Sequence, residues 1–262
     1  MKNNLVTPFI SLLLIFALTF SSNAQDKKRQ FYQLKTYTLI DEKQEGVMDA
    51  YLKDAYLPAL KRANIENVGV FKLRPSNYLV ANKIYVLIPF ESMDQFLTLD
   101  DMLAQDKTYI SAGQAYINAK YDEPPYERIN STLMKAFTGM PMMKAPEVEG
   151  SKKDRVYELR SYESPTEATY QNKVDMFNAG GEVELFDALG FNAVFYAEVL
   201  SGDRMPNLMY MTTFPNMKKR DALWEAFFAS EKWGKLKVDP KYLNNMSKAD
   251  KILLYPTEYS DY

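Results

Sequence analysis

YQLKTY at residues 32–37 and YELRSY at residues 157–162 decide how this sequence folds. Both stretches begin and end on tyrosine and alternate apolar with polar side chains, a pattern typical of a β-strand. Further matches follow in the same order and at nearly the same offset: Val70-Phe71 with Val194-Phe195, Phe90-Glu91-Ser92-Met93 with Phe214-Pro215-Asn216-Met217, and Leu103 and Tyr109 with Phe227 and Trp233. Several ordered matches at one offset indicate a tandem duplication, in which each copy is long enough to be a folding unit.

The same succession of elements is expected in both copies. In the first copy we predict strands at 31–38, 68–73, 84–90 and 128–137, a helix at 44–63 that Pro58 should kink or bring to its last turn, and a helix at 93–106. In the second copy we predict strands at 155–162, 191–200, 208–214 and 251–255, a helix at 167–189 that is interrupted near Gly180-Gly181, and a helix at 217–232. The order β-α-β-β-α-β is that of the ferredoxin-like unit. Its sheet has helices on one face only. We therefore predict an α+β fold in which two tandem ferredoxin-like (βαββαβ) units close their open faces around a cavity, as a barrel.

The rest of the chain divides around these two units. We expect units at residues 29–138 and 155–257, joined by a linker at 139–154 that is rich in Pro, Gly and charge. Residues 1–24 have the anatomy of a secretory signal peptide, with a charged start, an apolar run and small residues before the cut. This predicts cleavage between Ala24 and Gln25 and a secreted or periplasmic protein without stable membrane insertion after signal removal. The alternative is an uncleaved anchor, but the run is shorter than the about 20 residues of a membrane-spanning helix.

The composition excludes several classes of site. The chain has 262 residues and contains neither Cys nor His. It therefore has no Ser-His-Asp triad, no Cys nucleophile, no His-bound haem and no Cys/His zinc site. The formal net charge of −2 argues against nucleic acid as a partner. The acidic groups at 100–106 and 182–187 lack the loop spacing of a calcium site, so we predict neither a metal nor a cofactor.

The second copy resembles a known family, NIPSNAP. The resemblance is carried by VYELRSY at 156–162, and by ALWEAFF at 222–228 followed by SEKW at 230–233. It implies an exported, two-copy bacterial member of that family, with a dimeric α+β barrel of ferredoxin-like units and room for a homodimer. The first copy is a degenerate match, since Gln33 and Lys35 stand where the family has an acid and Arg. The resemblance implies no single activity, because relatives by fold include cofactor-free monooxygenases, haem-dependent enzymes and ligand binders.

The first strand of each copy supplies the candidate site. Side chains alternate along a strand, so Glu158, Arg160 and Tyr162 share one face. We predict that this face lines the cavity, with Arg160 binding a carboxylate or enolate oxygen and Tyr162 donating a hydrogen bond. A desolvated Glu158 would have a raised pKa and is the best candidate for a catalytic base. The alternative is a structural ion pair that fixes strand register. The corresponding ligand-binding candidates in the first copy are Gln33, Lys35 and Tyr37.

Three functions fit these features. We favour binding of a small aromatic or enolic molecule in the barrel cavity. The second hypothesis is a cofactor-free oxygenase or isomerase that uses the same cavity, since such chemistry can draw electrons from the substrate. The third is a non-catalytic protein-interaction module whose cavity is filled by side chains. Trp224, Phe227 and Phe228 recur at helical spacing, so we expect a core stripe there rather than a ligand wall.

Overall fold

The computed structural model describes residues 28–75 and 82–262. The signal peptide predicted at 1–24 lies outside the described residues. The chain forms a closed barrel of antiparallel strands in the order β1-β3-β2-β8-β5-β7-β6-β4. The strands are β1 (Phe31–Leu39), β2 (Gly69–Leu73), β3 (Asn82–Phe90), β4 (Arg128–Ala136), β5 (Val156–Glu163), β6 (Asn192–Ser201), β7 (Asn207–Phe214) and β8 (Lys248–Pro256). In the part of the chain that the structure describes, no helix has the length and apolarity needed to cross a membrane.

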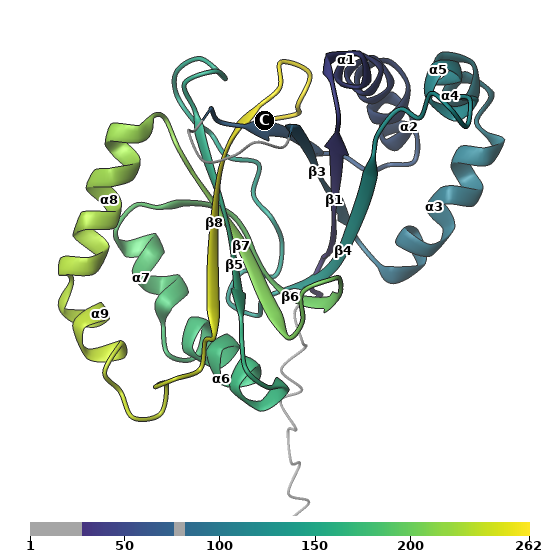
Figure 1. The fold of residues 1–262 in the computed structure, drawn as a ribbon. Helices are drawn as coiled ribbons and strands as arrows, with labels where there is room; N and C mark the ends of the chain where they lie inside the picture. The colour runs from purple at the N-terminus through teal and green to yellow at the C-terminus, as the bar shows by residue number, and fades with distance from the viewer. Residues whose placement is uncertain (1–27, 76–81) are drawn as a thin grey trace, which may run out of the picture.

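Each half of the chain contributes four adjacent strands, arranged in the same order. The halves meet at two seams, where β2 pairs with β8 and β4 pairs with β6. Figure 1 shows the helices of the two halves on opposite sides of the barrel. The first half has α1 (Glu42–Ala50), η1 (Tyr51–Tyr56), α2 (Leu57–Arg62), α3 (Met93–Gln105), α4 (Lys107–Ala112) and α5 (Gln114–Ile117). The second has α6 (Glu167–Asn178), α7 (Glu182–Ala188), α8 (Met217–Ala229) and α9 (Glu231–Leu236). The predicted fold class is confirmed.

The helix predicted at 44–63 is the element that differs most from expectation. It divides into α1, the π-helical η1 and α2, and Pro58 lies in the first turn of α2. Proline has no N–H to donate to the carbonyl one turn earlier, so an unbroken α-helix cannot run through it. A π-helical turn ahead of the proline changes the hydrogen-bond register without ending the helical path.

Most of the sheet is buried on both faces, by the helices on one and by the barrel interior on the other, but the first residues of β4 and β8 are exposed. The interior cluster takes side chains from both halves, among them Tyr32 and Leu34 of β1 and Tyr157 and Leu159 of β5. Side chains at the alternate positions of β1 and β5 point outward. There each half has its own hydrophobic cluster, which its helices cover. The barrel interior therefore holds the two halves together through apolar burial.

Aromatic rings fill one end of the interior, at the amino-terminal ends of β1 and β5; we call this the closed end. Tyr157 packs on Phe71 with ring centroids 4.9 Å apart, and Tyr32 packs on Phe195 at 5.4 Å. Tyr262 lies beside Phe71 at 5.9 Å and is buried. These rings close this end of the barrel interior.

The segments that follow β4 and β8 cover the closed end in equivalent ways. Phe137 N–H donates to the Tyr196 carbonyl of β6, and Thr257 N–H donates to the Val70 carbonyl of β2, each at 2.9 Å. Part of the linker predicted at 139–154 is thus fixed to the barrel, since Met143 N–H also donates to the Gln30 side chain. Each half therefore reaches across a seam to seal the barrel.

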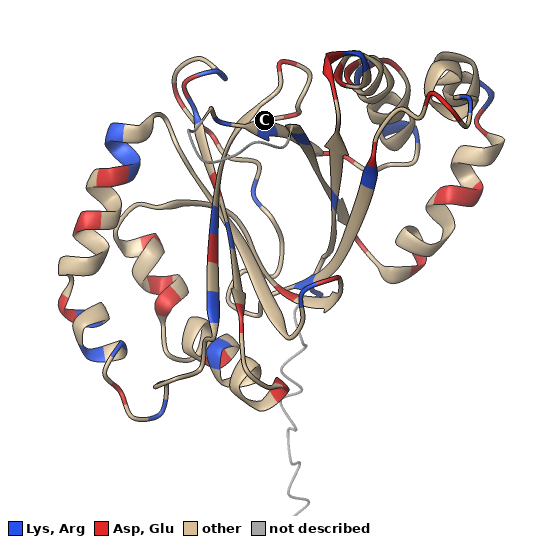
Figure 2. Ribbon diagram, viewed as in Figure 1, with Lys and Arg blue, Asp and Glu red and all other residues tan. Residues whose placement is uncertain are grey.

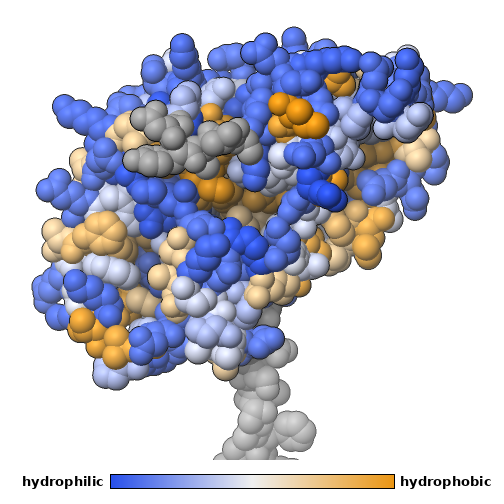
Figure 3. All heavy atoms as spheres, viewed as in Figure 1, coloured by the Kyte–Doolittle hydropathy of each residue, from blue (hydrophilic) through white to orange (hydrophobic). Residues whose placement is uncertain are grey.

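Acidic and basic residues lie interspersed on the side of the molecule that Figure 2 shows. Figure 2 shows both signs interspersed along α8 and α9. Figure 3 shows a largely hydrophilic face on which hydrophobic groups are scattered.

Candidate functional site

The predicted polar cluster of the second half lies outside the barrel interior. Glu158 and Tyr162 point toward the helices, whereas Tyr157, Leu159 and Ser161 point into the barrel. The prediction that the Glu158 face lines the cavity is wrong. The reason is physical: β5 is buried on both faces here, and Arg160, Arg220 and Trp224 on the helix side satisfy the Glu158 carboxylate.

Glu158 is fully buried and accepts three charge-assisted or indole hydrogen bonds. Arg160 Nε donates at 2.6 Å, Arg220 Nε at 2.5 Å and Trp224 Nε1 at 3.0 Å. The Arg160 guanidinium also lies 3.7 Å from the centre of the Trp224 ring, in cation–π contact. The carboxylate therefore ties β5 to α8.

These partners decide the charge of Glu158. Burial alone raises the pKa of its carboxyl, but hydrogen bonds and charge from Arg220 and Arg160 lower the pKa below its ordinary value of 4.5. The raised pKa predicted for a catalytic base is therefore wrong. Glu158 is a structural anion, in agreement with the ion-pair alternative.

Arg160 extends the network along β5. Its Nη1 donates to the Tyr162 hydroxyl at 2.9 Å, and that hydroxyl is 2.8 Å from the hydroxyl of Tyr210. A second buried ion pair, Lys173 with Glu182 at 3.2 Å, lies near the same ring. The polar groups of the cluster are paired with protein partners, and little of their surface is exposed.

The first-half candidates lie on the opposite outer face of the barrel. Gln33 donates to Ser131 Oγ at 2.8 Å, and Lys35 Nζ donates to the Tyr56 hydroxyl at 3.0 Å. Tyr37 is buried among the helices with Tyr126 at 5.5 Å. Burial lowers the pKa of Lys35. The prediction that both sets meet in one cavity is therefore wrong.

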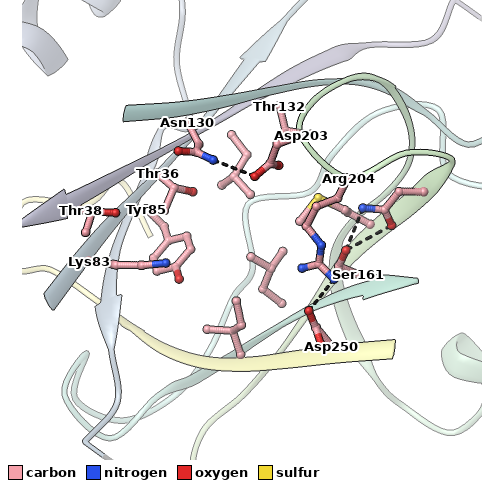
Figure 4. A pocket seen from close by; sticks show the side chains of 15 residues that line it. Thr36, Thr38, Lys83, Tyr85, Asn130, Thr132, Ser161, Asp203, Arg204 and Asp250 are labelled. Atoms are coloured by element: carbon pink, nitrogen blue, oxygen red, sulfur yellow. Dashed lines mark hydrogen bonds and ion pairs between the residues drawn. The ribbon is translucent and has the colours of Figure 1, made fainter. Parts of the chain in front are cut away.

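A different part of the barrel is open. A cavity of about 170 Å³ lies at the carboxyl ends of β1 and β5, and we call it the mouth cavity (Figure 4). Its apolar lining consists of Leu34, Tyr85, Leu159, Met209 and Ile252. Its polar lining consists of Thr36, Thr38, Lys83, Asn130, Thr132, Ser161, Asp203, Arg204, Asn207 and Asp250. Both halves of the chain contribute to each set.

The polar wall on the second-half side is largely bonded to itself. Asn207 Nδ2 donates to Ser161 Oγ at 2.8 Å, and both side chains are buried. Arg204 lies 2.5 Å from Glu163 through Nε and 2.5 Å from Asp250 through Nη2. Burial works against the charge of Arg204, but these two carboxylates raise its pKa. The guanidinium is thereby held in place as a fixed cation.

Two charged side chains of the mouth cavity have no ion-pair partner among the described residues: Lys83 and Asp203. Asp203 accepts a hydrogen bond from the neutral Asn130 amide at 2.8 Å. Lys83 lies next to Thr38 in the β1–β3 register and points toward the cavity in Figure 4. These two groups are available to a bound molecule.

Alternation along β1 and β5 could have indicated the mouth residues. Thr36 and Thr38 continue the face that begins with Tyr32 and Leu34, and Ser161 continues the face of Leu159. We assigned that face to the helices because it starts with apolar residues. Asp203 and Arg204, in the β6–β7 turn, give no comparable sequence signal.

No part of the described chain brings together three or more Asp or Glu side chains that could hold a metal ion. The polar atoms of the mouth cavity are hydroxyls, amides and separate charges. This set suits hydrogen bonding to an organic molecule.

Comparison with solved structures supports the barrel fold along nearly the whole chain. A candidate monooxygenase from Fusobacterium nucleatum superposes with a TM-score of 0.59 at 6% identity, covering 88% of this chain and 93% of its own. A candidate monooxygenase from Lactobacillus acidophilus gives 0.53 at 9% identity, over 87% and 94%. An anthrone oxidase-like protein gives 0.51 at 12% identity, over 88% and 93%. Identities this low establish a shared fold only.

Of the two sequence comparisons, only the one with family models found a match. No curated protein matches the chain. Among family models, the one named NIPSNAP matches residues 157–261. The match covers β5 through β8 and the segment that crosses the seam to β2.

Proposed function

We propose that the barrel built by the two halves, the second of which matches the NIPSNAP family model over residues 157–261, binds a small molecule in the mouth cavity. The observation that carries the proposal is the cavity itself, which has an apolar floor and a polar wall drawn from both halves. Concave sites where polar groups converge beside apolar side chains are candidates for binding small organic ligands.

The volume limits the ligand. The cavity of about 170 Å³ is smaller than the about 300–1,000 Å³ usual for drug-sized molecules. A cavity of about 150 Å³ is known to hold benzene. The ligand is therefore one small ring or a short branched chain carrying polar groups. The expected aromatic or enolic partner is of this size.

The ionisable groups with shifted pKa values favour binding over proton transfer. Burial raises the pKa of Tyr85 to about 12. The carboxylates of Glu163 and Asp250 raise the pKa of Arg204 and keep it protonated. A general acid or base works best with a pKa near the ambient pH. These two groups hydrogen-bond to a ligand without exchanging protons with it.

A cofactor-free oxygenase or isomerase reaction in the same cavity is the second function. This alternative is suggested by the names of three proteins with a similar fold, two candidate monooxygenases and an anthrone oxidase-like protein. The reactive electron pair would have to come from a ligand that is already ionised in solution. The two functions differ in whether the bound molecule is returned unchanged in air.

The test is ligand binding to a variant with a filled cavity. Thr36 lines the cavity from β1, so Thr36→Phe places a ring inside it. The matched control is Thr108→Phe, which makes the same change on the exposed surface of α4. We screen single-ring and short-chain acids, amines, amino acids and phenols by thermal shift and isothermal titration.

We expect at least one compound to bind the wild-type protein and the control equally, and Thr36→Phe to weaken that binding at least about tenfold, as steric exclusion from a packed site requires. Oxygen uptake and recovery of the compound then separate binding from turnover. Equal binding by Thr36→Phe, or no binding by any compound, would overturn the proposal.

A further inference from the structure

We propose that the molecule bound in the mouth cavity is a small zwitterion, an α-amino acid with a short apolar side chain. This inference rests on the proposed function and names its ligand class. It requires a cation, an anion and an apolar floor around one cavity of the right size. Lys83, Asp203 and the apolar lining residues meet those requirements.

Lys83 supplies the cation. It lies at the start of β3, paired in register with Thr38 of β1, and no described carboxylate is within ion-pair distance of it. The neighbouring residues 76–81 read SNYLVA and contain no acidic side chain. The hydroxyls of Thr36 and Thr38 line the same side of the cavity (Figure 4). An ammonium flanked by hydroxyls suits a carboxylate, because all of these groups can donate to its oxygens.

Asp203 supplies the anion from the other half of the chain. Its carboxylate accepts from Asn130 Nδ2 at 2.8 Å, and this neutral amide leaves its charge uncompensated. The other two carboxylates near the rim, Glu163 and Asp250, are both engaged by Arg204. Asp203 is therefore the acidic group that can accept from a ligand ammonium.

The two charges lie on different walls of the cavity, as Figure 4 shows. Lys83 is on β3, and the Asn130 side chain that holds Asp203 is on β4, with β1 between them. Adjacent strands are about 4.8 Å apart, so the two backbones are separated by about 10 Å. A molecule that carries both charges close together can lie between the two side chains.

The apolar lining determines which side chain the bound amino acid can have. Leu34, Leu159, Met209 and Ile252 supply most of the apolar lining of the cavity. A volume of about 170 Å³ equals about five or six water molecules at about 30 Å³ each. That is room for a backbone and a side chain such as that of alanine or valine. A long or charged side chain would lose its hydration against an apolar floor.

The experiment compares valine with its two single-charge analogues. Isovalerate lacks the ammonium group, and isobutylamine lacks the carboxylate. We measure binding of all three by isothermal titration to the wild-type protein, Lys83→Met and Asp203→Asn. Lys107→Met and Asp101→Asn, on exposed surfaces of α4 and α3, are the matched controls.

We expect valine to bind the wild-type protein and both controls at least about tenfold more tightly than either analogue, since each charge-assisted hydrogen bond contributes about that factor. Lys83→Met should remove the advantage of valine over isobutylamine but not over isovalerate. Asp203→Asn should remove the advantage of valine over isovalerate but not over isobutylamine.

Equal binding of valine and an analogue, variants that leave the preferences unchanged, or no binding by any of the three would each overturn the inference. In those cases the screen with Thr36→Phe still tests the proposed function. It stands if another compound binds and Thr36→Phe excludes it, and it fails with the inference if none does.

Discussion

Among single residues, Glu158 is a buried charge whose stability depends on its hydrogen-bonded partners. Its fully buried carboxylate faces two guanidinium groups and an indole N–H. Removing the charge leaves Arg160 and Arg220 close together without their anion. A buried charge that loses its partner costs more than the pair contributes when intact.

We predict that Glu158→Gln lowers the free energy of unfolding by about 3–5 kcal/mol at pH 7. The cost should shrink on acidification. The folded-state pKa of Glu158 lies below 4.5, so its ionised form contributes stability above the unfolded-state pKa and loses that contribution as the pH falls through the folded-state pKa. Urea denaturation of both proteins between pH 7 and pH 3 measures the difference.

Glu184→Gln is the control, because Glu184 is on the exposed side of α7 and its side chain is 79% accessible. It should change the stability by less than about 0.5 kcal/mol at every pH. A Glu158→Gln variant as stable as this control would show that the arginines do not need the charge.

At the level of elements, β2 depends on a glycine near the closed end. A Cβ at Gly69 would lie 2.5 Å from the Phe71 ring and 2.8 Å from the Tyr262 hydroxyl. Both neighbours belong to the packed interior and have little room to move. The missing side chain of Gly69 thus lets the segment after β8 place Tyr262 over the barrel end.

We predict that Gly69→Ala destabilises the protein by about 1–3 kcal/mol through overpacking. Gly46→Ala should stabilise it by about 0.5–1 kcal/mol, because Gly46 is in α1 and its Cβ would meet nothing within 4 Å. Chemical denaturation of the two variants gives the comparison. A neutral Gly69→Ala would mean that Tyr262 does not hold its place in solution.

The strands were predictable because alternation is a local signal. β1 spans Phe31–Leu39 against a predicted 31–38, and β7 spans Asn207–Phe214 against 208–214. The π-helical turn before Pro58 and the short helices α4 and α5 carry no such signal. The face assignment failed for a related reason, because alternation shows that two faces differ but not which one the helices cover.

For the molecule as a whole, closure of the barrel binds the two halves into one structure. The interior cluster joins Tyr32 and Leu34 of one half to Tyr157 and Leu159 of the other. A single half would expose this apolar face and two unpaired strand edges. Because the barrel closes within one chain, none of the described strands has an unpaired edge to which a second copy could add a strand.

We therefore predict that residues 155–262 produced alone do not remain monomeric. The open sheet should pair with a second copy of itself or aggregate, since burial of that face is what stabilises it. Size-exclusion chromatography with light scattering measures the mass. The full-length protein is the reference, and a stable monomer of the isolated half would contradict the prediction.

The sealed end of the barrel has a kinetic consequence. Rings and crossing segments occupy one end, so a molecule in the mouth cavity leaves by the route through which it arrived. Association and dissociation then pass over one shared barrier at the rim. A bulkier rim side chain that does not touch the bound molecule should slow both rates by the same factor and leave their ratio, the affinity, unchanged.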